Sequence, residues 1–511
     1  MGAGLYAGVF PAPREGLTAQ FFKMKPRKAH GNVHAVGRVA SCLILSASVL
    51  AGVRTGLAAD AAVAALDAGK ASGQSDAEVL LNLFQKKGII SSQDASEARD
   101  ALAKTHHDDS TSANSSKIHL PSWVESVTLG SDFRGRFEEN NAENAAYHAR
   151  DRFRYRLRLG AVFKLDGDFE IGFRLGSGNP LLNGAGAIVG GASQSASADF
   201  NSLDSRKFLW VDAAYARWTP VHDETWTVSS TIGKMDNPFS LSNMIWDYDI
   251  VPEGAAFQVN YKINANHAIK TTVAGFVLDE MNQSVTGYPT VDVNHDPYVL
   301  GGQMALESKW NSKFSTSAGV AVFDVGAKDS LSAQIQPFYN TGNTRDANGF
   351  LKYNYNPVIG TLSGTYKLDS APLYPGEFPI KLSGEYLNNP GAPTRNTAWR
   401  AGINFGKAGR KGAWEIAYRY QRLEADAWFD ALPDDDNGAF YAKGNTQLAG
   451  TPKSNGWFGG TNVKGHLIQG TYSFTDYLNF QFTYYLNELI VNVPGQTSSA
   501  GHFMADLNWK F

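Results

Sequence analysis

Residues 150–159 alternate between charged and apolar side chains. Arginine holds every even position from 150 to 158, while Phe153, Tyr155, Leu157 and Leu159 hold odd positions. Successive side chains of a β-strand point to opposite faces, so a period of two places five arginines on one face and the apolar groups on the other. The stretch therefore predicts a strand that separates an apolar environment from water.

The same alternation recurs toward the C-terminus, where residues 478–487 switch between apolar and polar side chains. Such a strand could belong to a soluble sandwich. However, the alternating segments are long enough to cross a bilayer at a tilt and longer than an ordinary strand of about 5 to 6 residues. Their polar faces carry Arg, Glu, Asn and Gln, and aromatic residues cluster at their ends. These features favour a membrane barrel.

Counting the alternating segments from residue 127 to the C-terminus predicts about 16 strands. They begin near residues 127, 150, 168, 207, 225, 254, 267, 297, 314, 357, 378, 397, 413, 462, 477 and 501. Brief connections such as 165–168 and 264–266 fall between long ones such as 179–206 and 426–461, as an up-and-down arrangement requires. Closure removes every sheet edge, which lipid demands. The predicted fold is an all-β transmembrane barrel of about 16 antiparallel strands whose short turns face the periplasm.

Charge and cysteine content exclude several other classes of protein. The 511-residue chain has a net charge of −3, which argues against nucleic acid as a partner. No apolar run of 18 or more residues follows the leader, so transmembrane helices are not expected. The single cysteine, Cys42, lies in the leader. The mature chain therefore has no disulfide, thiolate metal site or cysteine nucleophile.

The N-terminal region has the layout of a secretory signal peptide. Basic residues precede the apolar run 39–53, and small residues follow it up to Ala58 and Ala59. We expect residues 1–59 to hold an upstream extension and the signal peptide, with Met24 as the favoured translation start. This layout directs the protein out of the cytoplasm.

Two short helices and a linker are expected between the leader and the barrel. Residues 75–78 form a capping box, Gly88 ends the first helix, and a second helix spans about 92–104. This predicts a small periplasmic helical hairpin at 60–104, a linker at 105–124 and the barrel at 125–511. The hairpin either packs on a larger unit or serves oligomerisation or wall tethering.

The last strand carries a family resemblance. Phe503, Ala505, Leu507, Trp509 and Phe511 share one face, and the chain ends in phenylalanine. This arrangement resembles the assembly signal of Gram-negative outer-membrane barrels. It implies the Gram-negative outer membrane as the location, outer-membrane lipid as the surroundings, and recognition of Phe511 by the barrel assembly machinery.

A second resemblance lies in residues 235–254. Asn237-Pro-Phe239, Trp246-Asp247 and Pro252-Glu-Gly254 are similar to a segment of the family called putative porins. The resemblance implies a homotrimeric porin with a water-filled channel for passive diffusion of ions and small hydrophilic solutes. It also implies that this third long loop folds inward and narrows the channel.

Residues 235–254 combine apolar and acidic side chains. We expect the apolar ones to pack against the inner wall, because they gain by leaving water even inside a channel. The acidic ones would then face the aqueous path as a pore constriction. The apolar set is Phe239, Leu241, Met244, Ile245 and Trp246, and the acidic set is Asp236, Asp247, Asp249 and Glu253.

Six arginines on the inward side of the first three strands form a candidate basic wall. Opposite an acidic loop, such a wall gives a transverse field that orients polar solutes and penalises apolar ones. Alternatively, the arginines pair with Asp132, Glu138 and Glu170 as lumen structure. The six are Arg134, Arg136, Arg152, Arg154, Arg156 and Arg174.

Other site signals predict neither a metal nor a cofactor. Asp292, Asn294 and Asp296 have calcium-loop spacing, but proline follows where glycine is needed. The acidic run 434–436 suits a turn, and the His-His-Asp-Asp at 106–109 suits a linker. No Gly-x-Ser-x-Gly elbow or catalytic histidine is apparent, so no enzyme is expected. A non-conducting surface or adhesin barrel, or less favourably a barrel enzyme, is the alternative.

Overall fold

The computed structural model describes most of the barrel region in detail. The described residues are 120–143, 149–182, 188–191, 195–280, 296–331, 342–346, 349–441, 457–492 and 498–511. Residues 1–119 lie outside them. The predictions for the leader, for the hairpin at 60–104 and for most of the linker therefore fall outside the described residues.

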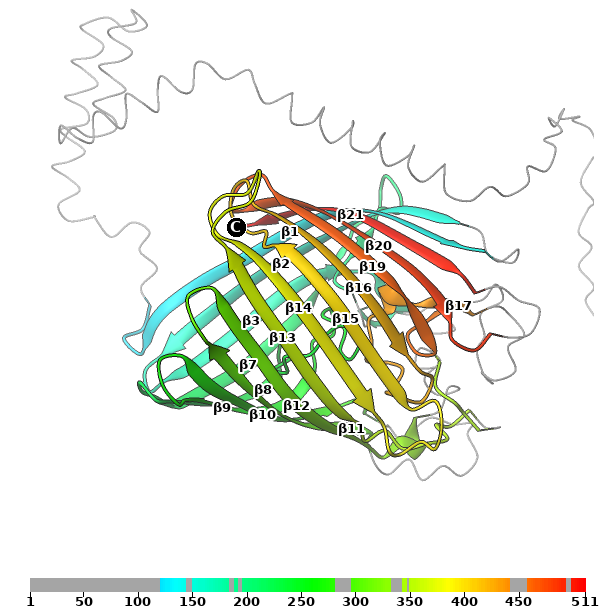
Figure 1. Cartoon of the computed structure of the whole chain (residues 1–511), viewed down its shortest axis with the longest axis horizontal. Coiled ribbons are helices and arrows are strands. Elements are labelled where there is room, and N and C mark those ends of the chain that lie inside the picture. The colour runs from blue at the N-terminus through cyan, green and yellow to red at the C-terminus, as the bar shows by residue number, and fades with distance from the viewer. Residues whose placement is uncertain are drawn as a thin grey trace, which may run out of the picture. The chain divides into compact units, whose positions relative to one another are not determined.

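Sixteen long strands, joined by antiparallel pairing, make one closed barrel (Figure 1). The first strand pairs with the last, so Asp132 lies opposite Lys510 and the sheet has no free edge. The predicted strand starts agree with these to within three residues. The strands are β1 (Val124–Ala142), β2 (Arg150–Leu165), β3 (Phe169–Gly178), β7 (Phe208–His222), β8 (Trp226–Lys234), β9 (Glu253–Lys262), β10 (His267–Val277), β11 (Tyr298–Lys309), β12 (Phe314–Gly326), β13 (Val358–Leu368), β14 (Phe378–Asn388), β15 (Thr397–Gly406), β16 (Trp414–Leu423), β19 (Val463–Ser473), β20 (Leu478–Leu489) and β21 (Ala500–Lys510).

Small elements decorate the connections between these strands. Among the described residues, no helix is long and apolar enough to cross a membrane. The small elements are β4 (Pro180–Leu182), β5 (Ile188–Gly191), β6 (Ala198–Asp199), β17 (Ala439–Tyr441), β18 (Trp457–Gly459) and the single-turn 3-10 helices η1 (Lys328–Ser330) and η3 (Asp435–Asn437).

Connections at the two ends of the barrel differ in length, as predicted. One end has brief turns such as 166–168 and 263–266, whereas the other has long ones. Two of the long connections matter most below. We name residues 235–252, between β8 and β9, loop 3, and residues 424–462, between β16 and β19, loop 7.

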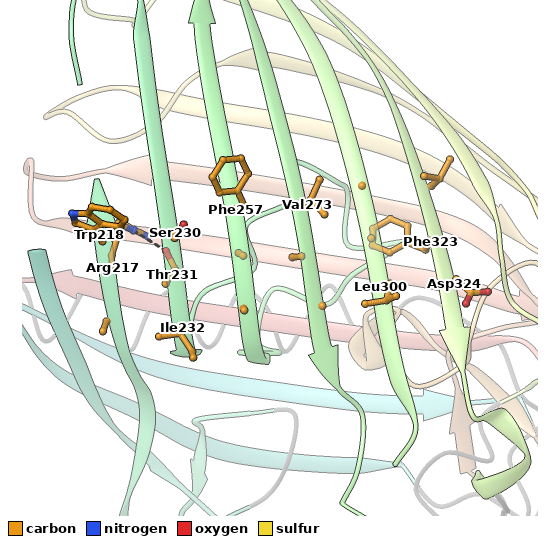
Figure 2. A pocket seen from close by; sticks show the side chains of 18 of the residues that line it. Arg217, Trp218, Ser230, Thr231, Ile232, Phe257, Val273, Leu300, Phe323 and Asp324 are labelled. Atoms are coloured by element: carbon orange, nitrogen blue, oxygen red, sulfur yellow. Dashed lines mark hydrogen bonds between the residues drawn. The ribbon is translucent and has the colours of Figure 1, made fainter. Parts of the chain in front are cut away.

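The outer face of the barrel is apolar. Ile232, Phe257, Val273 and Leu300 are about half exposed, and together they line a groove of about 800 Å³ across β7 to β12 (Figure 2). Apolar side chains on the outside are favourable only when hydrocarbon surrounds them, because contact with water would raise the free energy of the folded protein. The groove is therefore part of a lipid-facing surface.

The interior has two different halves. Inward positions on β10 to β12 carry Phe276, Val299 and Phe323, which are at most 4% exposed. Inward positions on β1 and β2 carry buried arginines such as Arg136 and Arg154. At these positions of β10 to β12 the inner face is apolar, and residues of the loops pack against it.

Candidate functional site

Loop 3 lies inside the barrel. Met244, Ile245 and Trp246 are at most 1% exposed. Phe239 packs edge to face on Phe323, with the ring centroids 4.9 Å apart. The predicted packing of the loop's apolar residues against the inner wall is confirmed, and it follows from the free energy that apolar surface gains by leaving water.

A glycine lies near the end of each of the two strands that loop 3 connects. Gly233 and Gly254 are paired residues of β8 and β9, with φ of 117° and 158°. A Cβ on Gly233 would clash with the carbonyl oxygen of Ala214, and one on Gly254 would clash with that of Gly275. Neighbouring backbone therefore admits only glycine at the two points where the chain leaves and rejoins the wall.

Polar side chains of the wall bind the backbone of loop 3. The Ser240 amide donates to Gln303 Oε1 at 2.8 Å, and Gln303 Nε2 donates back to the Ser240 carbonyl at 3.1 Å. Farther round the barrel, Ser242 donates to Glu385, and Arg400 donates to the side-chain oxygen of Asn243. The contacts of Gln303 satisfy backbone groups of Ser240 that are hidden from water, and the contacts of Glu385 and Arg400 hold polar side chains of the loop, so together they fix its position.

Loop 7 also folds inward and binds loop 3. Trp428 is fully buried, and its indole N–H donates to the Ile245 carbonyl at 2.7 Å. The Asp247 amide donates to the Leu432 carbonyl at 2.7 Å, and the Asp434 amide donates to the Asn243 carbonyl at 3.0 Å. Sequence reasoning missed this second inward loop. The one available signal was its largely apolar stretch 427–432, interrupted by Asp430, beside the three aspartates at 434–436.

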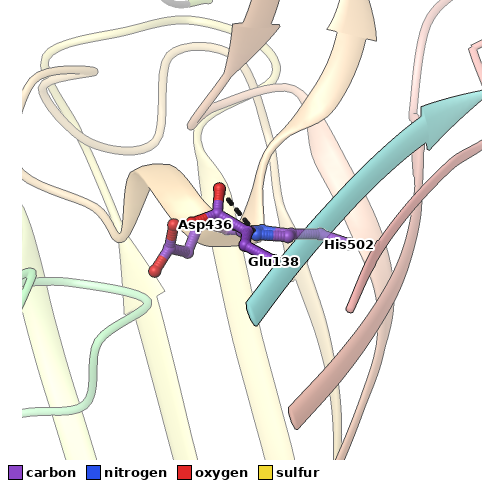
Figure 3. A group of neighbouring side chains, drawn as sticks. All are labelled: Glu138, Asp436 and His502. Carbon is purple, nitrogen blue, oxygen red and sulfur yellow. Dashed lines mark hydrogen bonds and ion pairs between the residues drawn. The ribbon is translucent and has the colours of Figure 1, made fainter. Parts of the chain in front are cut away.

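Charged side chains of β1 and β21 hold the turn of loop 7 that contains Asp436 (Figure 3). His502 Nδ1 lies 2.9 Å from the Asp436 carbonyl oxygen, and His502 Nε2 lies 3.3 Å from Glu138 Oε1. Arg136 binds both oxygens of Asp506, at 2.7 and 3.0 Å, and also reaches Asp436 at 3.4 Å. Burial acts to raise the pKa of Asp436, but His502 and Arg136 outweigh it and lower the pKa. Loop 7 thus spans from loop 3 to β1 and β21.

Most arginines of the wall form ion pairs with acids of the neighbouring strands. Arg152 and Arg154 both bind Glu138, and Arg156 binds Asp132 at 3.1 Å. The structural alternative is therefore realised for Asp132 and Glu138, and these pairs hold the arginines in place.

Two predicted wall contacts are absent or different among the described residues. Arg134 makes no ion pair there and donates instead to Ser197 Oγ at 2.7 Å. Glu170 pairs with Arg217 at 3.5 Å rather than with a member of the predicted wall.

Two of the four predicted loop acids meet the wall. Arg174 binds Asp236 at 2.7 Å, and their hydrogen bond lowers the pKa of Asp236. Arg156 reaches Asp249 at 3.5 Å. The other two acids differ: Glu253 pairs with Lys234 at 3.1 Å, and Asp247 is 5% exposed and makes no ion pair within the described part. A constriction role for these acids stays a prediction.

Between the wall and the loops a charged cavity of about 1040 Å³ remains. It is lined by residues of β1 to β3, β7, β16 and β19 to β21, such as Asp132, Glu415 and Asp506. Its lining alternates in charge: four arginines (Arg134, Arg156, Arg158 and Arg174) face four acids (Asp132, Asp236, Glu415 and Asp506). Such a lining suits water, ions and polar solutes and disfavours apolar ones.

Two groups of side chains could hold a metal ion among the described residues. Glu138, Asp436 and His502 form the first, and the arginines around them already balance its charge. The second is Asp247 with Asp434 and Asp435, where no arginine pairs with the acids. The two groups therefore differ in what they can bind.

A closed barrel of 16 strands with an apolar exterior, a charged interior cavity and inward-folded loops defines a membrane channel protein of the outer-membrane type. The family model described as "Putative porin" matches residues 141–348. The matched range runs from the end of β1 through β12 into the connection that follows it.

Solved structures are similar to the chain at low sequence identity. The high-pH structure of Pseudomonas putida OprB is 12% identical, with a TM-score of 0.45, and the match covers 75% of this chain and 94% of that one. A triple mutant of the Rhodopseudomonas blastica porin is 11% identical, with a TM-score of 0.36, over 76% and 100% of the two chains. No curated protein matches the sequence.

Proposed function

We propose that this protein is an outer-membrane porin through which ions and small hydrophilic solutes diffuse down their gradients. The observation that carries the proposal is the charged cavity inside a closed, lipid-facing barrel. The match to the porin family over residues 141–348 supports it independently. No step of the transport requires a cofactor or a chemical reaction, so we propose a channel and not an enzyme.

Loops 3 and 7 set the width of the path. They fill the half of the barrel along β10 to β15, and solutes pass along the arginine half. Arg156 and Arg174 lie on one side of this path, and Asp249 and Asp236 of loop 3 lie on the other. Opposed charges create a transverse field, which favours solutes with a dipole over apolar ones of equal size.

The location and partners follow from the same proposal. An outer-membrane barrel of this kind lies in the Gram-negative outer membrane with its short turns in the periplasm. We further propose assembly through recognition of Phe511 and a homotrimeric state. The apolar outer face and the paired C-terminal strand support insertion in lipid. Chemical cross-linking in mild detergent, followed by mass analysis, would show three linked chains.

Current recordings in a planar bilayer test the porin proposal. The mature chain, refolded without other proteins, would be added to a planar bilayer under a salt gradient. Stepwise, ohmic current is expected, and its reversal potential reports the ion preference. Insertion without current would overturn the porin proposal and favour a surface or adhesin barrel.

A further inference from the structure

Three carboxylates meet where loop 3 touches loop 7. Asp247 comes from loop 3, and Asp434 and Asp435 come from loop 7. One oxygen of each lies within 4.8 Å of an oxygen of each of the others. Two oxygens bound to the same Ca²⁺ at about 2.4 Å can be at most about 4.8 Å apart, so this spacing permits all three carboxylates to bind one ion.

Asp247 supplies the second observation. The residue is 5% exposed, and its Oδ1 accepts the Asp249 amide at 2.8 Å. Its Oδ2 is buried and has no hydrogen-bond donor within the described structure. A buried carboxylate oxygen without a donor is unfavourable, because desolvation is not repaid. A cation bound to this oxygen would offset the cost of its desolvation.

Neighbouring charges do not compensate the cluster. Within the described part of the chain, none of the three carboxylates forms an ion pair. The nearby cations are engaged elsewhere: Arg136 with Asp506, Arg156 with Asp132 and Asp249, and Arg154 with Glu138 and Asp199. The cluster therefore carries an excess of negative charge that a divalent cation can neutralise.

Besides these arginines, neutral donors and further acids lie around the cluster. Asn243 Nδ2 donates to Asp434, as does the Tyr485 hydroxyl at 3.1 Å. Burial and the neighbouring acids raise the pKa of Asp247 and bring that of Asp434 to about 7. Burial and the neighbouring acids also raise the pKa of Asp435, but the residue as a whole is exposed, which leaves a side from which an ion can enter. Asp249 and Asp436 add further negative field.

We infer that Asp247, Asp434 and Asp435 form a calcium-binding site that joins loop 3 to loop 7. Oxygen-only ligands suit a hard cation, and water on the exposed side completes the 6 to 8 ligands that Ca²⁺ takes. Mg²⁺ fits less well because it requires near-ideal octahedral geometry. A bound ion holds the two loops together and neutralises most of the negative charge of the three carboxylates.

The sequence pattern did not predict this site. The acidic run 434–436 does form a single turn, η3, as expected. Its ligand partner Asp247 is nearly 190 positions away in the chain, and only the folding of both loops into the barrel brings the two segments together.

The test uses the full mature chain refolded in synthetic lipid or detergent, free of lipopolysaccharide, which binds divalent ions itself. After removal of metal with EDTA, CaCl₂ is titrated by calorimetry at about pH 8, above the pKa of Asp434 of about 7. Terbium is the optical probe, because Trp246, adjacent to Asp247 in the chain, can sensitise its luminescence. Saturable binding of one Ca²⁺ per chain is expected, with Ca²⁺ displacing terbium.

Asp435→Asn is the most informative variant, because its side chain is exposed and makes no hydrogen bond that the fold needs. We expect about tenfold weaker Ca²⁺ binding, since affinity follows the number of charged ligands. Asp247→Asn should abolish binding. Asp329→Asn, an exposed acid on η1, is the matched control and should bind like the unaltered protein. Absence of saturable binding, or equal affinity in all three variants, would overturn the inference whether or not the barrel conducts.

Discussion

At the scale of single residues, the charged contacts between loop 3 and the wall govern ion preference. Asp249→Asn removes one of the two acids that Arg156 binds, so positive charge at the path increases. We expect the permeability ratio to shift toward anions by about twofold, read from the reversal potential under a salt gradient.

The control for this substitution is Asp369→Asn, an exposed acid between β13 and β14 at the short-turn end. It should leave the reversal potential unchanged. Equal reversal potentials for Asp249→Asn and the unaltered protein would show that Asp249 does not influence the ions in the channel.

The buried acids of the loop 3 and loop 7 contact predict a pH dependence. The pKa of Asp434 is raised to about 7, above its value in an unfolded chain, so the folded protein binds the extra proton. The contribution of this proton to the free energy of unfolding is fully present below the unfolded pKa near 4, and it is lost as the pH rises through about 7. Without calcium, the temperature at which the folded band disappears on a semi-native gel should therefore fall between about pH 5 and pH 8.

Calcium should reduce this fall, because the ion replaces the proton. Asp434→Asn should flatten the profile in EDTA. A profile in EDTA that is flat or rises with pH would contradict the assignment of these protons.

At the scale of elements, the packing of loop 3 is separable from the stability of the barrel. Trp246→Ala removes a side chain that is 1% exposed, which typically costs about 3 to 5 kcal/mol. The sixteen strands remain paired, so the loss falls on the position of the loop. Limited proteolysis within loop 3 should accelerate, and single-channel current should become noisier.

Tyr248→Ala is a matched control, since Tyr248 lies in the same loop and is 71% exposed. Proteolysis of this variant should match that of the unaltered protein. If both variants are cleaved equally fast, burial of Trp246 does not hold the loop.

Strand positions were predictable from the sequence, whereas the filling of the interior was only partly so. Alternation at residues 150–159 reports the local surroundings of a strand, and every barrel strand has such a local pattern. The contact of Trp428 with Ile245 depends on two loops meeting across the lumen, and no local period records that. Family resemblance indicated loop 3, but nothing comparable indicated loop 7.

At the scale of the whole molecule, the seam between β1 and β21 closes the barrel. Phe511 and Ser131 exchange two backbone hydrogen bonds, at 2.9 and 3.0 Å. Deleting Phe511 removes both bonds and the terminal aromatic group, so we expect slower folding into lipid and a less heat-stable barrel. The fraction that migrates as the folded form on a semi-native gel measures this.

Phe511→Ala separates the two contributions. It keeps the backbone bonds and loses only the ring, which is 69% exposed. Refolding in pure lipid should then be near normal, while assembly in cells is reduced. Equal behaviour of the deletion and Phe511→Ala in pure lipid would show that the backbone bonds at the seam contribute little.

The contact between loop 3 and loop 7 also limits how this channel can be re-engineered. Because Trp428 donates to the backbone of loop 3 and Asp434 accepts from Asn243, exchanging either loop alone would leave buried polar groups of the other without partners. A chimera with another barrel would have to transplant both loops as one cassette. Natural variants should change the two segments together for the same reason.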